Sequence, residues 1–380
     1  MGYEVHVIYC FYERWADKYD PDIIRRNADM YTMCGGHPVG SKFLYYKTRV
    51  RQKICSFLFR FINARLFAAN ALSRTHRESL AVATRQKSDL YIAHNLGALP
   101  AAVKAAAQNN AKTGYDAEDM DSGQFTSQQD AGYDLAKYIE QNYFPCVNYF
   151  TAASPLIAAS YKKIYGYLAP IVINNVFPVT SLTVRPGLTQ PQPLKLFWFS
   201  QTIGPNRGLE GTIEAIALTG RDISFHLLGQ CTSGYREFIT TFSKGKGLKN
   251  SQINIYGPVS PEKIFEIAPA FDIGMASEQG SPLNRDICLT NKVFTYIQCG
   301  LAIVASDTQA QALFLSQYPS AGLLYDKNNI EALAGCLKTY DDDRQLLYQT
   351  KQSNRILGQT KLNWENESLK FMQLIKDLEH

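Results

Sequence analysis

The stretch from residue 271 to residue 307 constrains the fold more than any other part of the chain, and it reads FDIGMASEQGSPLNRDICLTNKVFTYIQCGLAIVASD. Both of its ends are short apolar runs of the kind that forms buried parallel strands. Between them, a polar loop leads into residues 290–299, where apolar side chains at helical spacing predict a helix that Gly300 ends. Strand, loop, helix and strand make a βαβ unit. Because ligands collect at the carboxyl edge of such sheets, the loop after residue 276 is the first candidate site.

The same alternation of strands and helices extends over nearly the whole chain. In the first half, residues 13–46 are expected to be irregular and two helices to follow between residues 47 and 87. The predicted strands are residues 4–10, 89–94, 111–116, 148–152, 171–174, 194–200, 224–228, 253–256, 271–276 and 301–305. This pattern predicts an α/β protein with two doubly wound, Rossmann-like domains and a ligand cleft between them.

The length of 380 residues fits two domains of about 150 to 200 residues each. Residues 178–193, with four prolines and one charged residue, are typical of an interdomain linker. We therefore expect an N-terminal domain at residues 1–177, a second domain at residues 194–355 and a C-terminal helix at residues 356–380 that crosses back to the first domain.

The net charge of +5 is modest but unevenly placed. From residue 47 to residue 77 there is no acid, and apolar residues at helical spacing are interleaved with cations: Lys47, Arg49, Arg51, Lys53, Arg60, Arg65, Arg74 and Arg77. One interpretation is a helix packed on a sheet with a solvated basic side. The other is a contact surface for anionic lipid or an acidic acceptor. No nucleic-acid partner is expected.

Other composition signals narrow the cell compartment and the chemistry. The N-terminus does not resemble a signal peptide, and no apolar run approaches the ~20 residues of a membrane span. The eight cysteines include no CxxC pair, which argues against a zinc site and a disulfide framework. We expect a cytoplasmic protein whose basic segment can contact the inner face of a membrane.

Candidate site residues follow the predicted strands. Arg207 lies in GPNRG, between a strand and a helix start that would favour a phosphate. Glu278 follows the strand of the opening βαβ unit and could accept hydrogen bonds from hydroxyl groups. Asn291 and Lys292 open the next helix, where Lys292 could neutralise a phosphate. The structural alternatives are a surface arginine, a solvated glutamate and a helix N-cap at Asn291.

A second group of polar residues follows two strands of the first half. His94 stands where a strand meets the next loop, and Asp116, Glu118, Asp119 and Asp121 form an acidic turn one unit later. A lone histidine is often a satisfied structural residue. The acidic turn admits a metal ion, hydrogen bonds to hydroxyl groups, or a capping role.

These motifs resemble a known family. The segments AHNLGALPAAVKAA, YDAEDM, FWFSQTIGPNRGLEGTIEAI, FHLLG, INIYGPVSPEKI, FDIGMASE and NKVFTYIQCGLAIVASD follow the order found in retaining glycosyltransferases of the two-domain GT-B fold, family four. The resemblance covers nearly the whole chain. It implies a nucleotide-sugar donor as substrate, no cofactor and no metal, and a saccharide or lipid-linked saccharide as acceptor.

The resemblance also implies roles for individual residues. Catalytic roles fall to His94, Arg207, Glu278 and Lys292. Acceptor contacts fall to His94, Asp116, Glu118 and Asp119, and donor contacts to Gly204, Arg207, Gly208, Gly229, Pro258, Val259, Glu278, Gly280, Ser281, Asn291 and Lys292. The chain departs from the family in two places. Gln201 or Thr202 stands where many members carry an arginine, and the second of two paired glutamates falls at about Thr295.

The implied activity is a hexosyl transfer with retention, in bacterial surface polysaccharide synthesis. In a retaining course the leaving phosphate itself can take the acceptor proton, so that no protein nucleophile is required. Two other classes stay open: a sugar-nucleotide epimerase of the same fold, which needs no acceptor, and a non-catalytic nucleotide-sugar-binding module.

Overall fold

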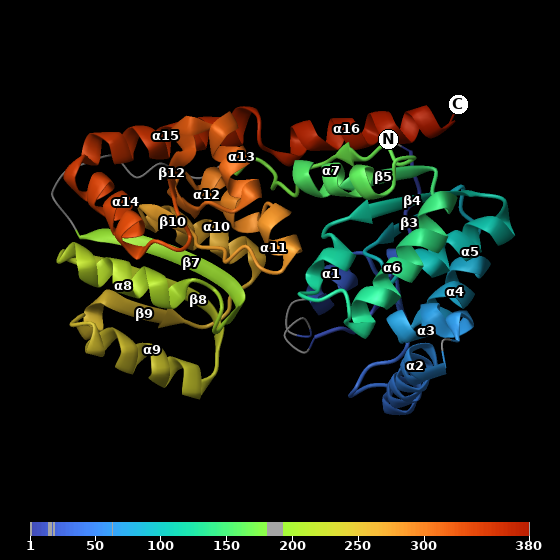
Figure 1. Cartoon of the computed structure of the whole chain (residues 1–380). Coiled ribbons are helices and arrows are strands. Elements are labelled where there is room, and N and C mark those ends of the chain that lie inside the picture. Colours follow the sequence, from blue (N-terminus) through green and yellow to red (C-terminus); the bar gives the residue numbers. More distant parts are fainter. Residues whose placement is uncertain (1, 14–16, 18–19, 63, 181–192, 380) are drawn as a thin grey trace. The chain divides into compact units, whose positions relative to one another are not determined.

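The computed structural model describes residues 2–13, 17, 20–62, 64–180 and 193–379, so most of the expected linker lies outside the described residues. The chain divides into two compact units, which are labelled by element in Figure 1. Unit 1 comprises Met1–Ala153 and Ile157–Val172, and unit 2 comprises Ser154–Leu156 and Ile173–His380. Residues 154–156 are therefore grouped with unit 2, although the residues on both sides of them belong to unit 1.

Unit 1 is built on a parallel four-stranded sheet. Its strands are β3 (Leu90–His94), β4 (Lys112–Ala117), β5 (Tyr149–Ala152) and β6 (Ile171–Val172), and they neighbour each other in chain order. The helices between them are α5 (Leu99–Asn109), α6 (Ala131–Tyr143) and α7 (Pro155–Ile164). Each of the four strands overlaps a strand that the sequence pattern predicts, and a helix follows each of the first three.

The first 87 residues differ from the prediction in two ways. Residues 13–46 are not irregular, because they contain α1 (Asp20–Arg26) and β2 (Tyr31–Cys34), which pairs with β1 (Val7–Cys10) in a separate two-stranded sheet. Strand β2 has four residues, of which Cys34 alone is buried, so its pattern in the sequence is too short to identify a strand. Three α-helices follow instead of two, α2 (Lys42–Ile62), α3 (Ala68–Leu72) and α4 (His76–Arg85), because Ser73 is extended and separates α3 from α4.

Unit 2 contains a parallel six-stranded sheet in the order β12-β11-β10-β7-β8-β9. The strands are β7 (Leu194–Ile203), β8 (Ile223–Cys231), β9 (Ile253–Tyr256), β10 (Ile273–Ala276), β11 (Ala302–Ser306) and β12 (Gly322–Tyr325). Counted within the unit, this is the order 3-2-1-4-5-6 of a Rossmann fold. The helices are α8 (Leu209–Thr219), α9 (Ser233–Gly245), α10 (Pro261–Ile267), α11 (Leu283–Ile287), α12 (Asn291–Cys299), α13 (Gln309–Gln317), α14 (Ile330–Asp342), α15 (Arg344–Thr360) and α16 (Trp364–Glu379).

Alternating side chains of β7 divide the core of unit 2 into two layers. Leu196 and Trp198 pack with helices α8 and α14 on one face of the sheet. Phe197 packs with helices α12 and α13 on the other face. Both faces of the sheet are therefore covered, and the predicted doubly wound architecture is confirmed.

The C-terminal segment, expected to be separate from residue 356 onward, is grouped with unit 2. The boundary expected at residue 356 falls inside α15, and α16 is grouped with unit 2. Glu367 of α16, which is almost fully buried, accepts hydrogen bonds from the backbone and the side chain of Asn174, at 3.0 and 3.1 Å. Among the described residues, no helix has the length and apolar character required to cross a membrane.

Candidate functional site

The central strands of unit 2 create a topological switch point. Strands β7 and β10 are neighbours, but the chain moves from β7 toward β8 and from β10 toward β11, on opposite sides. The connections that follow the two strands therefore lead to opposite sides, and the carboxyl edge between them, which we call the crevice, is where doubly wound folds bind ligands. The first loop holds Gly204, Arg207 and Gly208, and the second begins at Ser277 and Glu278.

The loop after β7 approaches the loop after β10 so closely that a side chain on Gly208 would not fit. Gly208 has φ +72°, and a Cβ atom there would lie 2.4 Å from the backbone oxygen of Ser277. The Ser277 hydroxyl donates a hydrogen bond to the backbone oxygen of Arg207, at 3.2 Å. Arg285 donates to the backbone oxygen of Asn206, at 3.1 Å. The two loops are thus held together by side chains of the second loop that donate to the backbone of the first.

Helix α8 begins directly after this loop, at Leu209. Gly208 is its N-cap residue and carries no side chain that could cap the helix, so the first N–H groups of α8 keep their positive partial charge at the crevice. Gly204 is buried and the Arg207 side chain is half-buried beside the helix start. Glycines, an arginine and a helix N-terminus together form a suitable environment for phosphate groups.

Glu278 and Lys292 form an ion pair at the same crevice. The Lys292 ammonium donates to Glu278 Oε1 at 2.7 Å, each side chain is 12% exposed, and the Lys292 nitrogen lies 5.6 Å from the centre of the Trp198 ring. Burial alone would raise the pKa of Glu278. The attraction and hydrogen bond of Lys292, together with the charges of Arg285 and Arg207, outweigh burial and lower the pKa below its ordinary value. The carboxylate is therefore ionised among three cations.

The backbone around Glu278 is fixed by a residue that sequence reasoning did not assign to the site. The hydroxyl of Ser306, at the end of β11, donates to the backbone oxygen of Glu278 at 2.7 Å and contacts that of Ala276 at 3.3 Å. Ser277, Arg285 and Trp198 were missed as well. The only signal in the sequence is position, because Ser277 and Ser306 each follow or end a buried strand at this edge.

The other predicted site residues of the second loop and of α12 are Gly280, Ser281 and Asn291, and they differ in exposure and in neighbours. Gly280 has φ +73° and lies near the side chains of Lys327 and Asp286, while Ser281 and Asn291 are exposed. The loop is not entirely irregular as we expected, because residues 283–287 form the short helix α11. Asp286 of α11 accepts hydrogen bonds from the backbone N–H, at 3.1 Å, and the side-chain amide of Gln309.

Gly229 has a structural reason to be glycine. It lies inside β8 with φ +154°, and a Cβ atom would lie 2.2 Å from the backbone oxygen of Ser200, where the pairing of β7 and β8 shifts register. Pro258 and Val259 follow β9, at the same edge as the crevice but two strands away from β7.

The two departures from the family pattern also have structural explanations. Gln201 and Thr202 belong to β7, which runs three residues further than predicted, to Ile203. The position expected for a second glutamate is Thr295, which is buried in α12 with 1% exposure. Thr295 is therefore packed inside unit 2 and does not offer a hydroxyl group to a ligand at the surface of the crevice.

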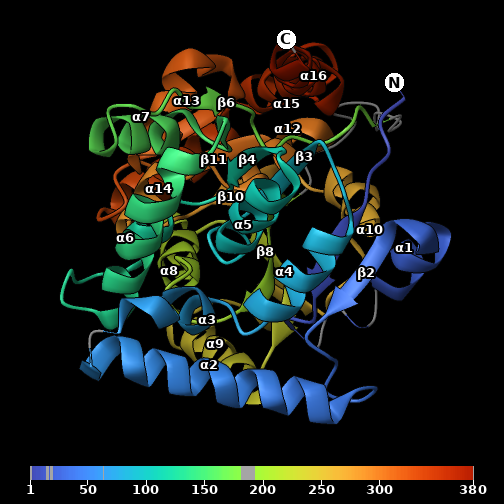
Figure 2. The same ribbon diagram turned by 90° about the vertical axis from the view of Figure 1, so that its right-hand side faces the viewer.

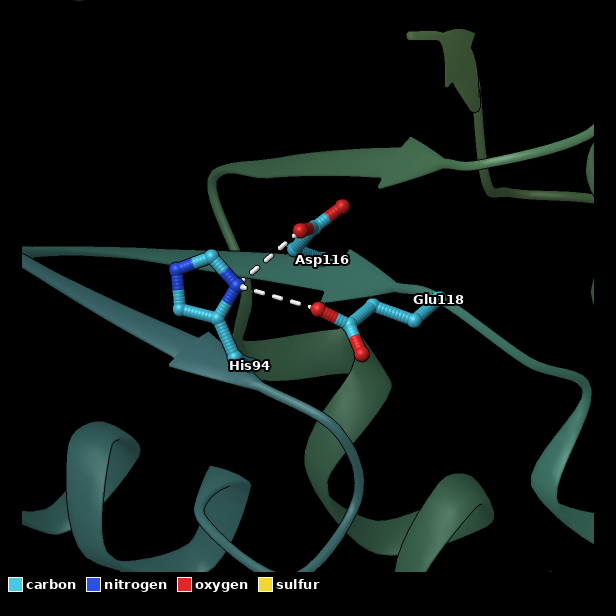
Figure 3. Close-up of side chains that lie close together, drawn as sticks. All are labelled: His94, Asp116 and Glu118. Atoms are coloured by element: carbon cyan, nitrogen blue, oxygen red, sulfur yellow. Dashed lines mark ion pairs between the residues drawn. The ribbon is translucent and has the colours of Figure 1, made fainter. Parts of the chain in front are cut away.

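In unit 1, adjacent strand ends bring His94 and two acids together, as Figure 3 shows. His94 Nδ1 lies 3.0 Å from Asp116 Oδ2 and 4.0 Å from Glu118 Oε1. Thr151 of β5 donates to the other oxygen of Asp116 at 2.9 Å. The hydrogen bond to Asp116, with both negative charges, raises the pKa of His94 although burial opposes the rise. The pKa of Glu118 is raised by burial and by Asp116.

This cluster presents His94 Nε2 to the outside. Because Nδ1 is oriented toward Asp116, it is the nitrogen that carries the proton, and Nε2 is left for a ligand. The His94 side chain is 63% exposed. The ligand atoms of His94, Asp116 and Glu118 also lie within 4.8 Å of one another, which would suit a divalent cation if Nδ1 gave up its proton.

Asp121, further along the same turn, has a different role from its neighbours. The hydroxyl of the buried Tyr115 donates to Asp121 Oδ2 at 2.8 Å, and the backbone of Leu96 in the loop after His94 also contributes a hydrogen bond. Burial is the main reason that the pKa of Asp121 rises to about 7. Asp121 therefore connects the turn after β4 to the loop after β3, and Asp119 is half-buried.

Comparison with known proteins identifies the architecture but no sequence family. No protein-family model matches the sequence, and no curated protein matches it.

Solved structures do match. The crystal structure of Anabaena Alr3699/HepE in complex with UDP and glucose aligns with a TM-score of 0.70, covers 97% of this chain and 91% of that chain, and is 16% identical. A glycosyltransferase from Rickettsia africae ESF-5 aligns at 0.65 over 98% and 90% of the two chains with 12% identity. Sucrose-phosphate synthase from Thermosynechococcus elongatus aligns at 0.63 over 80% and 77% with 16% identity. The chain therefore has the fold of these proteins, the two Rossmann-like domains of the GT-B architecture.

Proposed function

We propose that this protein is a glycosyltransferase that moves a hexosyl group from a nucleotide-sugar donor to a saccharide or lipid-linked saccharide acceptor. The observation that carries the proposal is the switch point of unit 2, where Arg207, the start of α8 and the Glu278–Lys292 pair surround one crevice. The neighbour complexes with UDP and with UDP-glucose support a uridine diphosphate donor as the first to test.

The proposed chemistry follows from the charges that develop. Cleavage of a glycosyl–phosphate bond leaves negative charge on the diphosphate and positive charge on the sugar. Arg207, Lys292 and the N-terminus of α8 stabilise the diphosphate. Glu278 is already ionised and accepts hydrogen bonds from hydroxyl groups of the donor. A metal ion is not required in this scheme, because Arg207 and Lys292 neutralise the negative charge of the leaving diphosphate.

Unit 1 supplies the groups for the acceptor in this proposal. Asp116 orients His94 so that Nε2 forms a hydrogen bond with a hydroxyl group, as acceptor when the ring is neutral and as donor when it is protonated, and Glu118 offers an acceptor oxygen. His94 is then an orienting residue, and transfer proceeds with retention as the leaving phosphate takes the acceptor proton. Bacterial surface polysaccharide synthesis is the role that we propose for such a reaction.

The test of the donor site compares Arg207→Ala with Lys244→Ala, an exposed lysine of α9, as a control for the loss of one cation. We would measure binding of UDP and of uridine by calorimetry. Arg207→Ala should weaken UDP binding about 10- to 100-fold and leave uridine binding unchanged, because the lost contact is to phosphate. Equal weakening for both ligands, or a similar effect in Lys244→Ala, would contradict the assignment.

The test of the reaction uses UDP-glucose and other UDP-sugars, with and without saccharide acceptors. Release of UDP that depends on the acceptor, together with a new glycoside, supports a transferase. A change of the donor sugar without an acceptor would instead identify an epimerase. His94→Ala should lower turnover and preserve UDP affinity, because unit 2 holds the nucleotide. Normal turnover in that variant would remove His94 from the mechanism.

A further inference from the structure

Helix α2 (Lys42–Ile62) has a packed face in unit 1 that is well defined. Tyr45, Thr48, Cys55 and Phe59 are buried along this face. The helix packs on α3, and the Gln52 amide donates to the backbone oxygens of Ala71 and Leu72 at 3.2 and 3.1 Å. Figure 2 shows α2 along the outer side of α3.

The opposite face of α2 is apolar and exposed. Its side chains, 54% to 83% exposed, are Phe43, Tyr46, Val50, Ile54, Phe57 and Phe61, which we call the outer stripe. They recur at steps of three and four residues and so lie along one line of the helix. For Ile54, Phe57 and Phe61, the interpretation of an apolar face packed on a sheet is therefore wrong.

Cations flank the outer stripe on both sides. At 100° per residue, Lys47 lies on one flank of the stripe, and Lys53 and Arg60 lie on the other. All three side chains are exposed. Arg49 is directed to the packed face, where it donates to the Tyr45 hydroxyl at 2.8 Å. Other cations of the basic segment point elsewhere. Arg51 forms an ion pair with Glu78, and Arg74 donates to the backbone oxygens of Gly35 and Phe11.

We propose that the outer stripe of α2 binds the surface of an anionic phospholipid membrane. Aromatic and aliphatic side chains on one line, with lysine and arginine on both flanks, suit a helix that lies in the headgroup region with its apolar side toward the acyl chains. Each flanking cation meets anionic lipid headgroups. An apolar area of this length is rarely left exposed without a partner.

A second copy of the chain is a weaker candidate for the partner. Residues 30–77 contain no acid, so two copies that met through the outer stripe would bring their flanking cations together without a counter-charge. Anionic lipid supplies both the apolar medium and the negative charge. Binding to vesicles requires no nucleotide sugar and no turnover, so this proposal can fail or succeed independently of the proposed activity. If both hold, a lipid-linked saccharide becomes the first acceptor to test.

The experiment measures partitioning of the full chain to vesicles by co-sedimentation. Vesicles of phosphatidylglycerol and phosphatidylcholine are compared with vesicles of phosphatidylcholine alone, at low and high salt. Phe57→Ser/Phe61→Ser removes apolar area, and Lys47→Gln/Lys53→Gln removes charge. Ile356→Ser/Leu369→Ser is the matched control, because these side chains are 58% and 62% exposed on α15 and α16. Circular dichroism confirms that each variant is folded.

We expect binding to the anionic vesicles that weakens at high salt. Loss of the two lysines should lower the partition coefficient about 30-fold, and loss of the two phenylalanines roughly 100-fold. The control variant should bind like the unchanged protein. Binding that ignores lipid charge, no binding, or equal losses in the control would overturn the proposal. A dimer in sedimentation velocity that Phe57→Ser/Phe61→Ser converts to a monomer, without vesicle binding, would identify the stripe as a subunit interface instead.

Discussion

The Glu278–Lys292 pair offers a sharp test of the electrostatics at the crevice. The changes are Glu278→Gln, which keeps the shape and removes the charge, Lys292→Met, which keeps most of the stem, and the two combined. Both side chains are only 12% exposed, so removal of one partner leaves an incompletely solvated charge. Because the surroundings of the two charges differ, the two single variants should not be equally unstable.

The magnitudes follow from what remains after each change. Loss of one partner of a buried ion pair destabilises a protein by about 3–5 kcal/mol. In Lys292→Met, the carboxylate still has the charges of Arg207 and Arg285 nearby, so we expect a smaller loss of about 1–2 kcal/mol. In Glu278→Gln, the ammonium loses its counter-ion and keeps only like charges and the Trp198 ring, so we expect about 3 kcal/mol. The double variant should lose less than the sum, by about 2 kcal/mol.

Denaturant unfolding followed by tryptophan fluorescence measures these free energies. Trp198 is buried in the core of unit 2 beside Lys292, so its emission reports the unfolding of this unit. Equal destabilisation by both single changes, or an additive double variant, would refute the reasoning, because either result means that the two charges are not coupled within the crevice.

The coupling should also depend on pH in one direction. The pKa of Glu278 lies below its ordinary value of 4.5, so the unfolded state takes up a proton first as the pH falls. The contribution of the pair is therefore fully present above pH 4.5 and is lost as the pH falls through the lower pKa of the folded state. A coupling energy that grew on acidification would have the wrong sign.

Three further predictions concern the loop, the histidine and a metal ion. Gly208→Ala should destabilise the protein by about 1–2 kcal/mol because of the φ of +72° alone, and its clash with Ser277 should also lower the affinity for UDP. Gly211→Ala is the control: this position lies inside α8 with open space around it, so the change should stabilise the protein by about 0.5–1 kcal/mol. Unfolding curves that rank the two variants the other way would contradict this. Asp116→Asn should lower the pKa of His94, measured by NMR titration of its ring protons, because the hydrogen bond to a carboxylate is lost, and an unchanged pKa would show that the pair does not form. Transfer activity should survive EDTA; a loss that is restored by a divalent cation would assign a metal to the cluster of His94 and the two acids.

Local patterns in the sequence were sufficient for most strands and helices of both units. Buried parallel strands appear as short apolar runs, and helix ends carry their own signals, as Gly300 does with the left-handed φ of +65° that ends α12. The sequence also predicts that Arg207 and Glu278 lie at the carboxyl edge of the sheet in unit 2, and His94 and Asp116 at that of the sheet in unit 1, because each lies near or just after the end of a parallel strand. Strands, helices and helix ends depend on residues that are close in the sequence, so a local sequence pattern is sufficient to predict them.

Tertiary structure decided which of these residues meet. Three contacts join residues that are far apart along the chain. Glu278 pairs with Lys292 across 14 positions, and the Ser306 hydroxyl donates to the backbone of Glu278 across 28. Gly208 meets Ser277 across about 70 positions. No periodicity encodes such distances, because they result from the order of strands in the sheet. Strand β2, which pairs with β1, was missed for a local reason, because its four residues make too short a pattern.

Helix α2 shows the limit most clearly. Its sequence contains two apolar lines, one with Tyr45 and Phe59 and the other with Phe57 and Phe61, and helical spacing alone does not say which of them packs. In the structure the first line packs against α3, because the small alanine side chains of α3 allow the two helices to approach closely. Arg51 forms an ion pair with Glu78 beside this contact. The sequence determined that a helix forms and that it is basic, whereas packing against the rest of unit 1 determined which face remained for solvent or for a membrane.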